Sequence, residues 1–272
     1  MSFTIDNNLF LLEKDKPNTI VGFSKKEIKT HQGISGLKYY LIVMYLRKHL
    51  QTFGQVDLTL NQLLEECGYS TKSHNKSIYS DFREIIKTEV VNKGYATCNV
   101  DIFTINPNEM FSLYMSDKKS IFFTKDNFVQ LTISEYEKIC KSNQKANKSV
   151  ILGVYLFIKQ FILADTDFNS QVIKISYPSK SQIKKGIGVA INTIENAISI
   201  LEDLNMLYVR RDMYIENSDE PGTYTPARNV FALKKEELYN STVLMELENF
   251  YGKPVFTKDS LPGDIKFLTK EE

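Results

Sequence analysis

Four polar side chains recur at helical spacing near residue 195, and together they could bond to the edges of DNA bases. They are Asn192, Thr193, Asn196 and Ser199. Residues three and four apart share one face of a helix, so these side chains are expected to point outward together. Asparagine can form two hydrogen bonds with adenine, and threonine or serine can bond several bases. The chemistry expected from this stretch is recognition of base edges, without a bond being made or broken.

Basic residues flank this stretch on both sides but are absent from it. They are Lys180, Lys184 and Lys185 before it, and Arg210, Arg211 and Arg228 after it. Lysine and arginine contacts to phosphate position a protein on DNA without reading its sequence, and we expect that role here. Glu195 also points outward, and it would repel phosphate unless it accepts a hydrogen bond from cytosine.

The polar stretch belongs to a series of helices and short strands in the second half of the chain. The pattern predicts a helix at Lys148–Ala164, a strand at Val172–Ile175, a short helix around Gln182–Lys185 that begins at Ser179 or Ser181, a turn at Gly186–Gly188, a helix at Ala190–Leu204, and strands at Leu207–Arg211 and Val230–Leu233. A polar loop is expected from Glu216 to Arg228, between the last two strands.

The first half repeats this order of elements, although its sequence is different. Its pattern predicts helices at Gly36–Gln51, Leu60–Glu66 and Lys76–Glu89, a short strand at Val56–Leu58, and strands at Val90-Val91 and Tyr95–Ile105 around a turn at Lys93-Gly94. Thr59 is expected to cap the second of these helices, and Gly68 to end it in a left-handed conformation. Residues 106–126 are interpreted as a linker region or a connecting helix around Glu109–Met115, followed by extended segments at Ile121–Phe123 and Phe128–Ile133.

The first half also has its own candidate DNA contacts, which precede and line its third helix. They are Lys72, Ser73, His74, Asn75, Lys76, Tyr79 and Arg83. These residues form a more basic set than the polar stretch of the second half. We therefore expect much of the electrostatic attraction to DNA to come from here.

The segment Ile194–Leu207 resembles the recognition helix and exit strand of bacterial winged-helix proteins. It reads Ile-Glu-Asn-Ala-Ile-Ser-Ile-Leu-Glu-Asp-Leu-Asn-Met-Leu. Ala197 stands where a small residue lets two helices approach, and Asn205 stands where a left-handed residue ends the helix. Gly188 supplies the sharp turn before the helix.

Two such units in one chain look like the plasmid replication initiators with tandem winged-helix domains. They are similar, too, to the initiator and replisome-organiser domains of Gram-positive plasmids and phages, in which a segment like Gln130–Ser134 leads into a long helix. The resemblance implies an α+β fold of two tandem winged helix-turn-helix domains, at residues 1–120 and 121–240, with a tail at 241–272. It also implies sequence-specific binding of double-stranded DNA at repeated origin sites, homodimer formation and contact with host replication proteins.

Two other functions stay open on these residues. A winged-helix transcriptional regulator would bind an operator, usually a palindrome that matches a two-fold dimer. A non-catalytic adaptor would use the same fold to bind another protein.

An enzyme is not expected. The sequence has no GxxxxGK[ST] motif, and His31, His49 and His74 form neither an HxH nor an HExxH pair. Tyr39-Tyr40 could be imagined as nicking nucleophiles, but core packing explains them better. No cofactor is expected, and no metal site, because Cys67, Cys98 and Cys140 lack ligand spacing.

Composition narrows the class further. Apolar residues make up 42% and charged residues 25% of the 272 residues, as in ordinary globular proteins. The net charge of +1 excludes a histone-like protein, so any DNA-binding charge must be local. Val150–Ala164 is too short and too polar to cross a membrane, and few, unpaired cysteines fit a reducing compartment. We expect a cytoplasmic protein that does not bind membranes.

Overall fold

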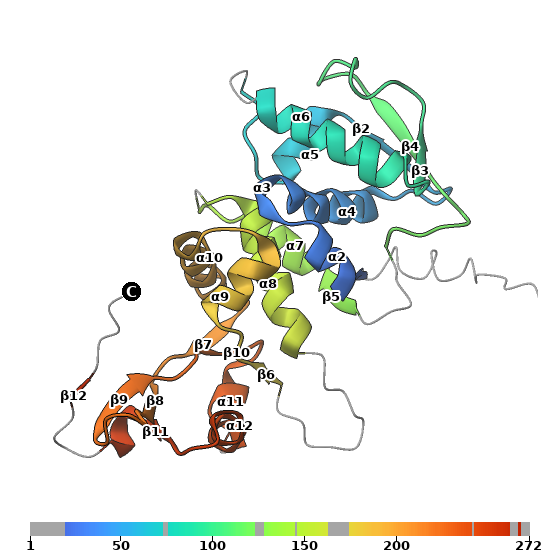
Figure 1. Cartoon of the computed structure of the whole chain (residues 1–272). Coiled ribbons are helices and arrows are strands. Elements are labelled where there is room, and N and C mark those ends of the chain that lie inside the picture. The colour runs from blue at the N-terminus through green and yellow to red at the C-terminus, as the bar shows by residue number, and fades with distance from the viewer. Residues whose placement is uncertain are drawn as a thin grey trace, which may run out of the picture.

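The computed structural model shows an α+β protein (Figure 1). It describes residues 20–72, 76–122, 128–144, 146–162, 174–240, 242–261 and 266–267. The first half contains β1 (Ile20–Ser24), α2 (Lys25–Thr30), α3 (Gly33–Gly36), α4 (Lys38–His49), β2 (Gln55–Leu58), α5 (Leu60–Glu66), α6 (Lys76–Ile85), the π-helix η1 (Ile86–Val91), β3 (Ala96–Cys98) and β4 (Phe111–Met115).

The second half repeats this order and then extends it. It contains β5 (Phe128–Thr132), α7 (Ile133–Cys140), α8 (Lys148–Ile162), β6 (Ile175–Ser176), α9 (Lys180–Ile187), α10 (Ile191–Asp203), β7 (Tyr208–Arg210), β8 (Met213–Glu216), β9 (Thr223–Pro226), β10 (Val230–Ala232), α11 (Lys235–Leu238), α12 (Thr242–Tyr251), β11 (Val255–Thr257), the 3-10 helix η2 (Lys258–Ser260) and β12 (Lys266–Phe267).

The repeat predicted from element order is visible in the sheets. Each half has a three-stranded sheet in which the last strand lies in the middle, with orders β2-β4-β3 and β6-β10-β7. The strands that begin the two halves, β1 and β5, pair with each other in antiparallel register, from Ile20 opposite Thr132 to Ser24 opposite Phe128. The two halves are therefore joined by a strand pair to which each contributes one strand.

Helix caps repeat in the same way. Each half has a capping box at the start of its first helix and another at the start of the helix after its short strand. The pairs are Ser24 with Glu27, Thr59 with Gln62, Thr132 with Glu135, and Ser179 with Gln182. The expected cap at Thr59 is thus confirmed, and of the two expected starts, Ser179 and Ser181, it is Ser179 that caps α9.

The two halves also pack reciprocally at their glycine turns. Gly68 follows α5 with φ +79°, and a β-carbon there would lie 2.9 Å from the carbonyl oxygen of Cys140. Gly188 follows α9 with φ +70°, and a β-carbon there would lie 3.0 Å from the backbone nitrogen of Gly33. Each glycine turn therefore contacts the backbone of the other half close to where the first two helices of that half are connected.

Replacing Gly188 with alanine is expected to lower the free energy of unfolding by about 2–4 kcal/mol. The left-handed conformation costs roughly 1–2 kcal/mol for a residue with a β-carbon, and displacing the Gly33 backbone costs roughly 1–2 kcal/mol more. Gly94 is the matched control, because its φ is +73° and a β-carbon there would have nothing within 4 Å. Urea unfolding of both alanine variants measures the difference. Equal losses would mean that the close approach to Gly33 contributes nothing.

One hydrophobic core runs through both halves. It includes Leu41 of α4, Val154 of α8 and Leu201 of α10. At the crossing of α4 and α8, a β-carbon on Gly153 would lie 2.6 Å from a methyl carbon of Leu37, so the helices are in close contact. The core is continuous across the expected domain boundary at residues 120 and 121, and the domain limits themselves stay predictions.

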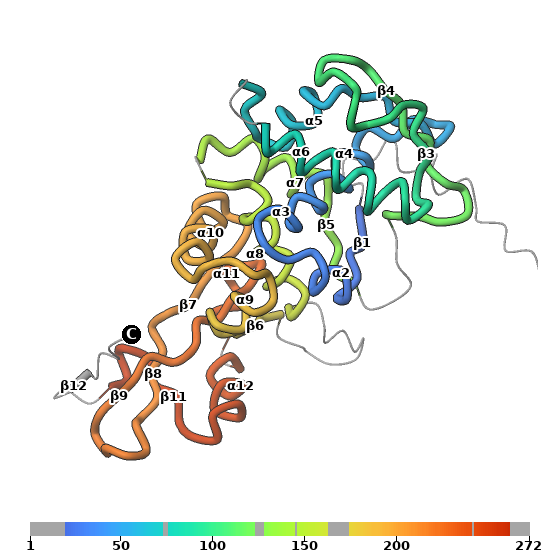
Figure 2. The backbone as a smooth tube through the Cα atoms, turned by 45° about the horizontal axis from the view of Figure 1, so that its top comes forward, coloured from blue at the N-terminus to red at the C-terminus, as the bar shows by residue number. Residues whose placement is uncertain are grey.

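A smaller second core lies beyond the sheet of the second half. Met213, Leu238, Val243 and Leu247 are buried in it, where β8 and β9 pair and β11 and β12 add to their outer edges (Figure 2). The predicted loop at Glu216–Arg228 therefore contains β9. The predicted tail after residue 240 contains α12 and β11, because Val243 and Leu247 lie one helical turn apart and are both buried.

Three further sequence expectations were wrong. Val90-Val91 belongs to η1 and not to a strand, because buried Ile86 and Val90 extend the apolar side of the helix. Glu109–Met115 is not a helix, since β4 covers Phe111–Met115 with Phe111 and Leu113 buried at alternating positions. The segment Gln130–Ser134 does not lead straight into the long helix α8, because it ends β5 and begins α7, which lies between β5 and α8.

Candidate nucleic-acid interface

The polar face of α10 is where the sequence places it. Asn192, Thr193, Asn196 and Ser199 are all exposed. The opposite face is buried, with Ile194, Ala197, Ile198 and Leu201 in the main core. Asn205 adopts φ +50° after the helix, which confirms the expected left-handed residue. The exposed amides and hydroxyls of α10 are thus held on a rigid element.

The start of α10 is a second feature of this surface. Gly188, Val189 and Ala190 form the turn after α9, and no side chain caps the first backbone N–H groups of α10. A shallow depression at this turn is lined by Ser181, Lys184, Lys185, Gly188, Val189 and Ala190. Both lysines are exposed. Free N–H groups at a helix start attract anions, and two lysines add to that attraction.

The acidic residues of α10 are largely neutralised by basic residues outside it. Lys180 forms an ion pair with Glu195, and Arg211 binds Glu202, with its Nη1 2.9 Å from Oε1. The hydrogen bond with Glu202 raises the pKa of Arg211. The repulsion that Glu195 would exert on phosphate is therefore offset, and Lys180 and Arg211 are engaged within the protein.

Arg210 is not placed to contact phosphate. Its side chain is buried, and its Nε donates to Asp212 at 2.9 Å and its Nη1 to the carbonyl oxygen of Leu238 at 3.0 Å. The guanidinium also lies over the ring of Tyr239. The predicted phosphate contact does not fit this residue, which joins β7 to α11.

Arg228 is half-buried between α9 and α12. Its Nη1 donates to Gln182 at 3.3 Å, and its guanidinium carbon lies 4.6 Å from the ring centre of Phe250. It therefore stands at the edge of α9, with its side chain oriented by packing on α12.

In the first half, two of the predicted DNA-binding side chains form hydrogen bonds within the protein instead. The Tyr79 hydroxyl bonds to Asn61, and Arg83 donates to the carbonyl oxygen of Ile105 at 2.6 Å. Lys72 and Lys76 are exposed, whereas Ser73, His74 and Asn75 lie outside the described residues. The loop between β3 and β4 is held against α5 and α6, so this half offers less free positive charge than its sequence suggests.

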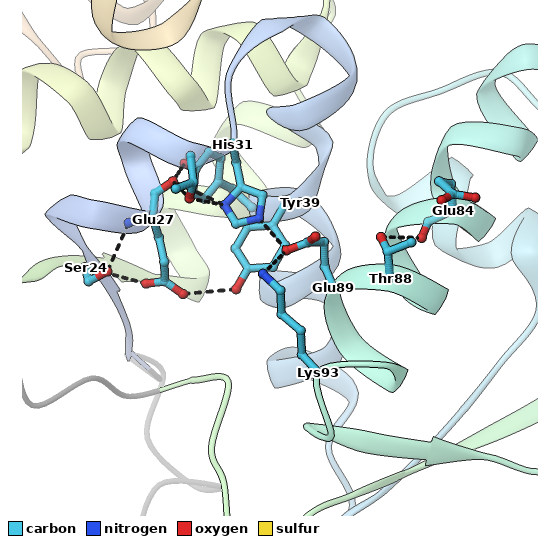
Figure 3. A network of polar contacts seen from close by, with 10 residues as sticks. Ser24, Glu27, His31, Tyr39, Glu84, Thr88, Glu89 and Lys93 are labelled. Carbon is cyan, nitrogen blue, oxygen red and sulfur yellow. Dashed lines mark hydrogen bonds and ion pairs between the residues drawn. The ribbon is translucent and has the colours of Figure 1, made fainter.

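A polar network holds the corner between α2 and α3 (Figure 3). His31 Nε2 lies 2.8 Å from Glu89 Oε2, and its ring stacks on Tyr39 at 3.9 Å. The Tyr39 hydroxyl donates to Glu27 at 3.1 Å. Burial, together with the charge of Glu27, raises the pKa of Tyr39 far above its usual range. This buried tyrosine stays protonated as a donor, in keeping with core packing.

The carboxylate of Glu89 is hydrogen-bonded to both Lys93 and His31 in the same network. Burial alone would raise its pKa, but the hydrogen bonds from Lys93 and His31 outweigh burial and lower it. On the same helical stretch, the Thr88 hydroxyl donates to the backbone oxygen of Glu84. The α2–α3 corner is therefore anchored to η1 of the first half.

The sequence reasoning missed the part of the first half that reaches α9. Gln32 Nε2 donates to the backbone oxygens of Lys185 at 3.3 Å and Gly186 at 2.9 Å. The pattern Ser24-x-x-Glu27 before buried Ile28 is the local signal that could have revealed α2. A contact across some 150 residues has no local signal.

No protein-family model matches the sequence, and no curated protein matches it. Within the described ranges, none of the helices has both the length and the apolar content to cross a membrane. Among those same residues, no cluster of three or more histidine, cysteine or acidic side chains could hold a metal ion.

Proposed function

We propose that the protein binds double-stranded DNA in a sequence-specific manner, with α9 and α10 as a helix-turn-helix. The observation that carries this proposal is the exposed face of Asn192, Thr193, Asn196 and Ser199. Among the hydrogen bonds and ion pairs of the described residues, none involves these four side chains. Unpaired amides and hydroxyls on a rigid helix suit the major groove, where each base pair presents its own donors and acceptors.

The surroundings of α10 support the same proposal. A three-residue turn with a left-handed glycine joins α9 to α10, as in helix-turn-helix motifs. The exposed Lys184 and Lys185 precede that turn and suit phosphate. The element order, with β10 between β6 and β7, fits a winged helix, and the matching order of the first half fits a tandem of two.

We further propose that the role is that of a plasmid- or phage-type replication initiator at repeated origin sites. This choice rests on the resemblance of Ile194–Leu207 and on two similar units in one chain. Homodimer formation, host replication proteins as partners and a cytoplasmic location belong to the same proposal. A transcriptional regulator would instead protect an operator near its own promoter.

The test begins with selection of bound duplexes from a random library, followed by footprinting on the replicon that encodes the protein. Protection of short repeats at the origin is expected. Protection of a promoter alone would indicate a regulator, and retention of no duplex would exclude DNA binding.

The double variant Lys184→Glu/Lys185→Glu is expected to bind the selected duplex at least roughly 100-fold more weakly, since each of the two lost charged hydrogen bonds contributes about 1.5–3 kcal/mol. Both side chains are exposed, so the fold should persist. The matched control is Lys235→Glu/Lys258→Glu, which reverses two exposed charges in the C-terminal part. Equal loss in both variants, measured by fluorescence anisotropy, would show that α9 has no special role.

A further inference from the structure

A helix of the first half lies directly beside the proposed helix-turn-helix of the second. α2 packs against α9, and both helices bury isoleucines in the same core, Ile28 from α2 and Ile183 and Ile187 from α9. In the tube view, α2, α3 and α9 lie close together (Figure 2). The exposed sides of these two helices therefore face solvent next to each other.

The junction between the two helices is fixed by backbone contacts. Gln32, just after α2, donates to the carbonyl oxygens of Lys185 and Gly186. Gly33 and Gly188 approach so closely that a β-carbon on Gly188 would lie 3.0 Å from the Gly33 nitrogen. His31 is in turn held by Glu89 and Tyr39. The position of α2 relative to α10 is thus set by the fold.

The surface formed by the two helices is positive. α2 exposes Lys26 and Lys29 and partly exposes Lys25, and α9 exposes Lys184 and Lys185. The one acidic residue of α2 is Glu27, which turns inward to the backbone N–H of Ser24 and the hydroxyl of Tyr39. α9 contains no acidic residue. No carboxylate of either helix therefore opposes the exposed lysines.

We propose that DNA bound by α10 also runs over α2, so that Lys26 and Lys29 of the first half bind its phosphates. This inference rests on the proposed function. It makes the DNA-binding surface a composite of both halves, in which α10 reads bases and α2 adds sequence-independent attraction. An exposed pair of lysines on a helix that packs against α9, the first helix of the proposed helix-turn-helix, suits the regular negative charge of a duplex.

The test measures how DNA affinity depends on salt. Each phosphate contact contributes about 0.9 to the slope of log affinity against log salt concentration. In Lys26→Gln/Lys29→Gln, the magnitude of this slope for the selected duplex is expected to decrease by about 2. The preferred DNA sequence should not change. The matched control, Lys235→Gln/Lys258→Gln, is expected to keep the parental slope.

The variant Lys184→Gln/Lys185→Gln separates this inference from the proposed function. If its slope falls while that of Lys26→Gln/Lys29→Gln stays parental, DNA binding by α9–α10 stands and the composite surface is wrong. If the parent binds no duplex at all, the proposed function fails.

Discussion

Replacing Glu135 with alanine is expected to lower the free energy of unfolding by about 3–5 kcal/mol. Glu135 Oε1 lies 2.6 Å from the Nζ of Lys159, whose side chain is only 8% exposed. The same carboxylate accepts hydrogen bonds from the Tyr155 hydroxyl and from the backbone of Thr132. Its removal leaves the ammonium of Lys159 buried without its partner, and also breaks the capping box of α7. Urea unfolding monitored by circular dichroism measures the loss.

A control on the same helix is Glu137→Ala. Glu137 pairs with Lys48 at 2.7 Å and with the well-exposed Lys141 at 3.2 Å, so we expect a loss of no more than about 1 kcal/mol. If the two alanine variants lose equal stability, the buried position of the Glu135–Lys159 pair has no special importance.

The effect of Glu135 depends on pH with a defined sign. Burial alone would raise its pKa, but the charge of Lys159 and the hydrogen bonds from Lys159, Tyr155 and Thr132 outweigh burial and lower it. A carboxyl whose pKa is lower in the folded state stabilises that state fully at a pH above the pKa it has in the unfolded chain, about 4.3. That stabilisation is lost as pH falls through the folded pKa. The difference in the free energy of unfolding between the parent and Glu135→Ala should therefore become smaller below about pH 4.3.

The second large effect is expected on base recognition. In Asn192→Ala/Asn196→Ala, affinity for the selected duplex should fall by about 2–6 kcal/mol, because a two-pronged contact contributes about 1–3 kcal/mol of discrimination. Affinity for a scrambled duplex should change little, since phosphate contacts provide it. Both side chains are exposed, so their loss should not affect folding.

Parallel titrations of the selected and scrambled duplexes by anisotropy measure this loss of specificity. Asp203→Asn changes another exposed residue of α10 at its far end and serves as the control. An equal loss on both duplexes in Asn192→Ala/Asn196→Ala would mean that these residues position α10 and do not read bases.

Much of the architecture could be predicted because its signals are local. The caps at Thr59 and Ser179, the left-handed Asn205 and the turn at Gly188 depend only on nearby residues. The strand β4 was missed because polar neighbours of Phe111 looked like a linker. The helix α12 was missed because its burial depends on the small second core, to which distant elements contribute.

The candidate site shows the same limit. Helical spacing was enough to predict the exposed face of α10, because the buried positions of one helix determine the exposed ones. Which basic residues bind partners within the protein could not be predicted from the sequence. Arg210 donates to the carbonyl oxygen of Leu238, 28 residues away, and Arg83 donates to that of Ile105, 22 residues away. A charge pattern cannot distinguish such internal partners from phosphate.

The pairing of β1 with β5 has a consequence for synthesis of the chain. The paired residues lie far apart in sequence, with Ile20 opposite Thr132 and Ser24 opposite Phe128. Among the strands that the structure describes, β1 pairs with β5 alone, so during translation this pair cannot form until β5 has left the ribosome. A nascent chain shorter than that exposes an unpaired strand edge, which favours association with other chains. The first half thus completes its fold late, when the start of the second half can close the strand pair.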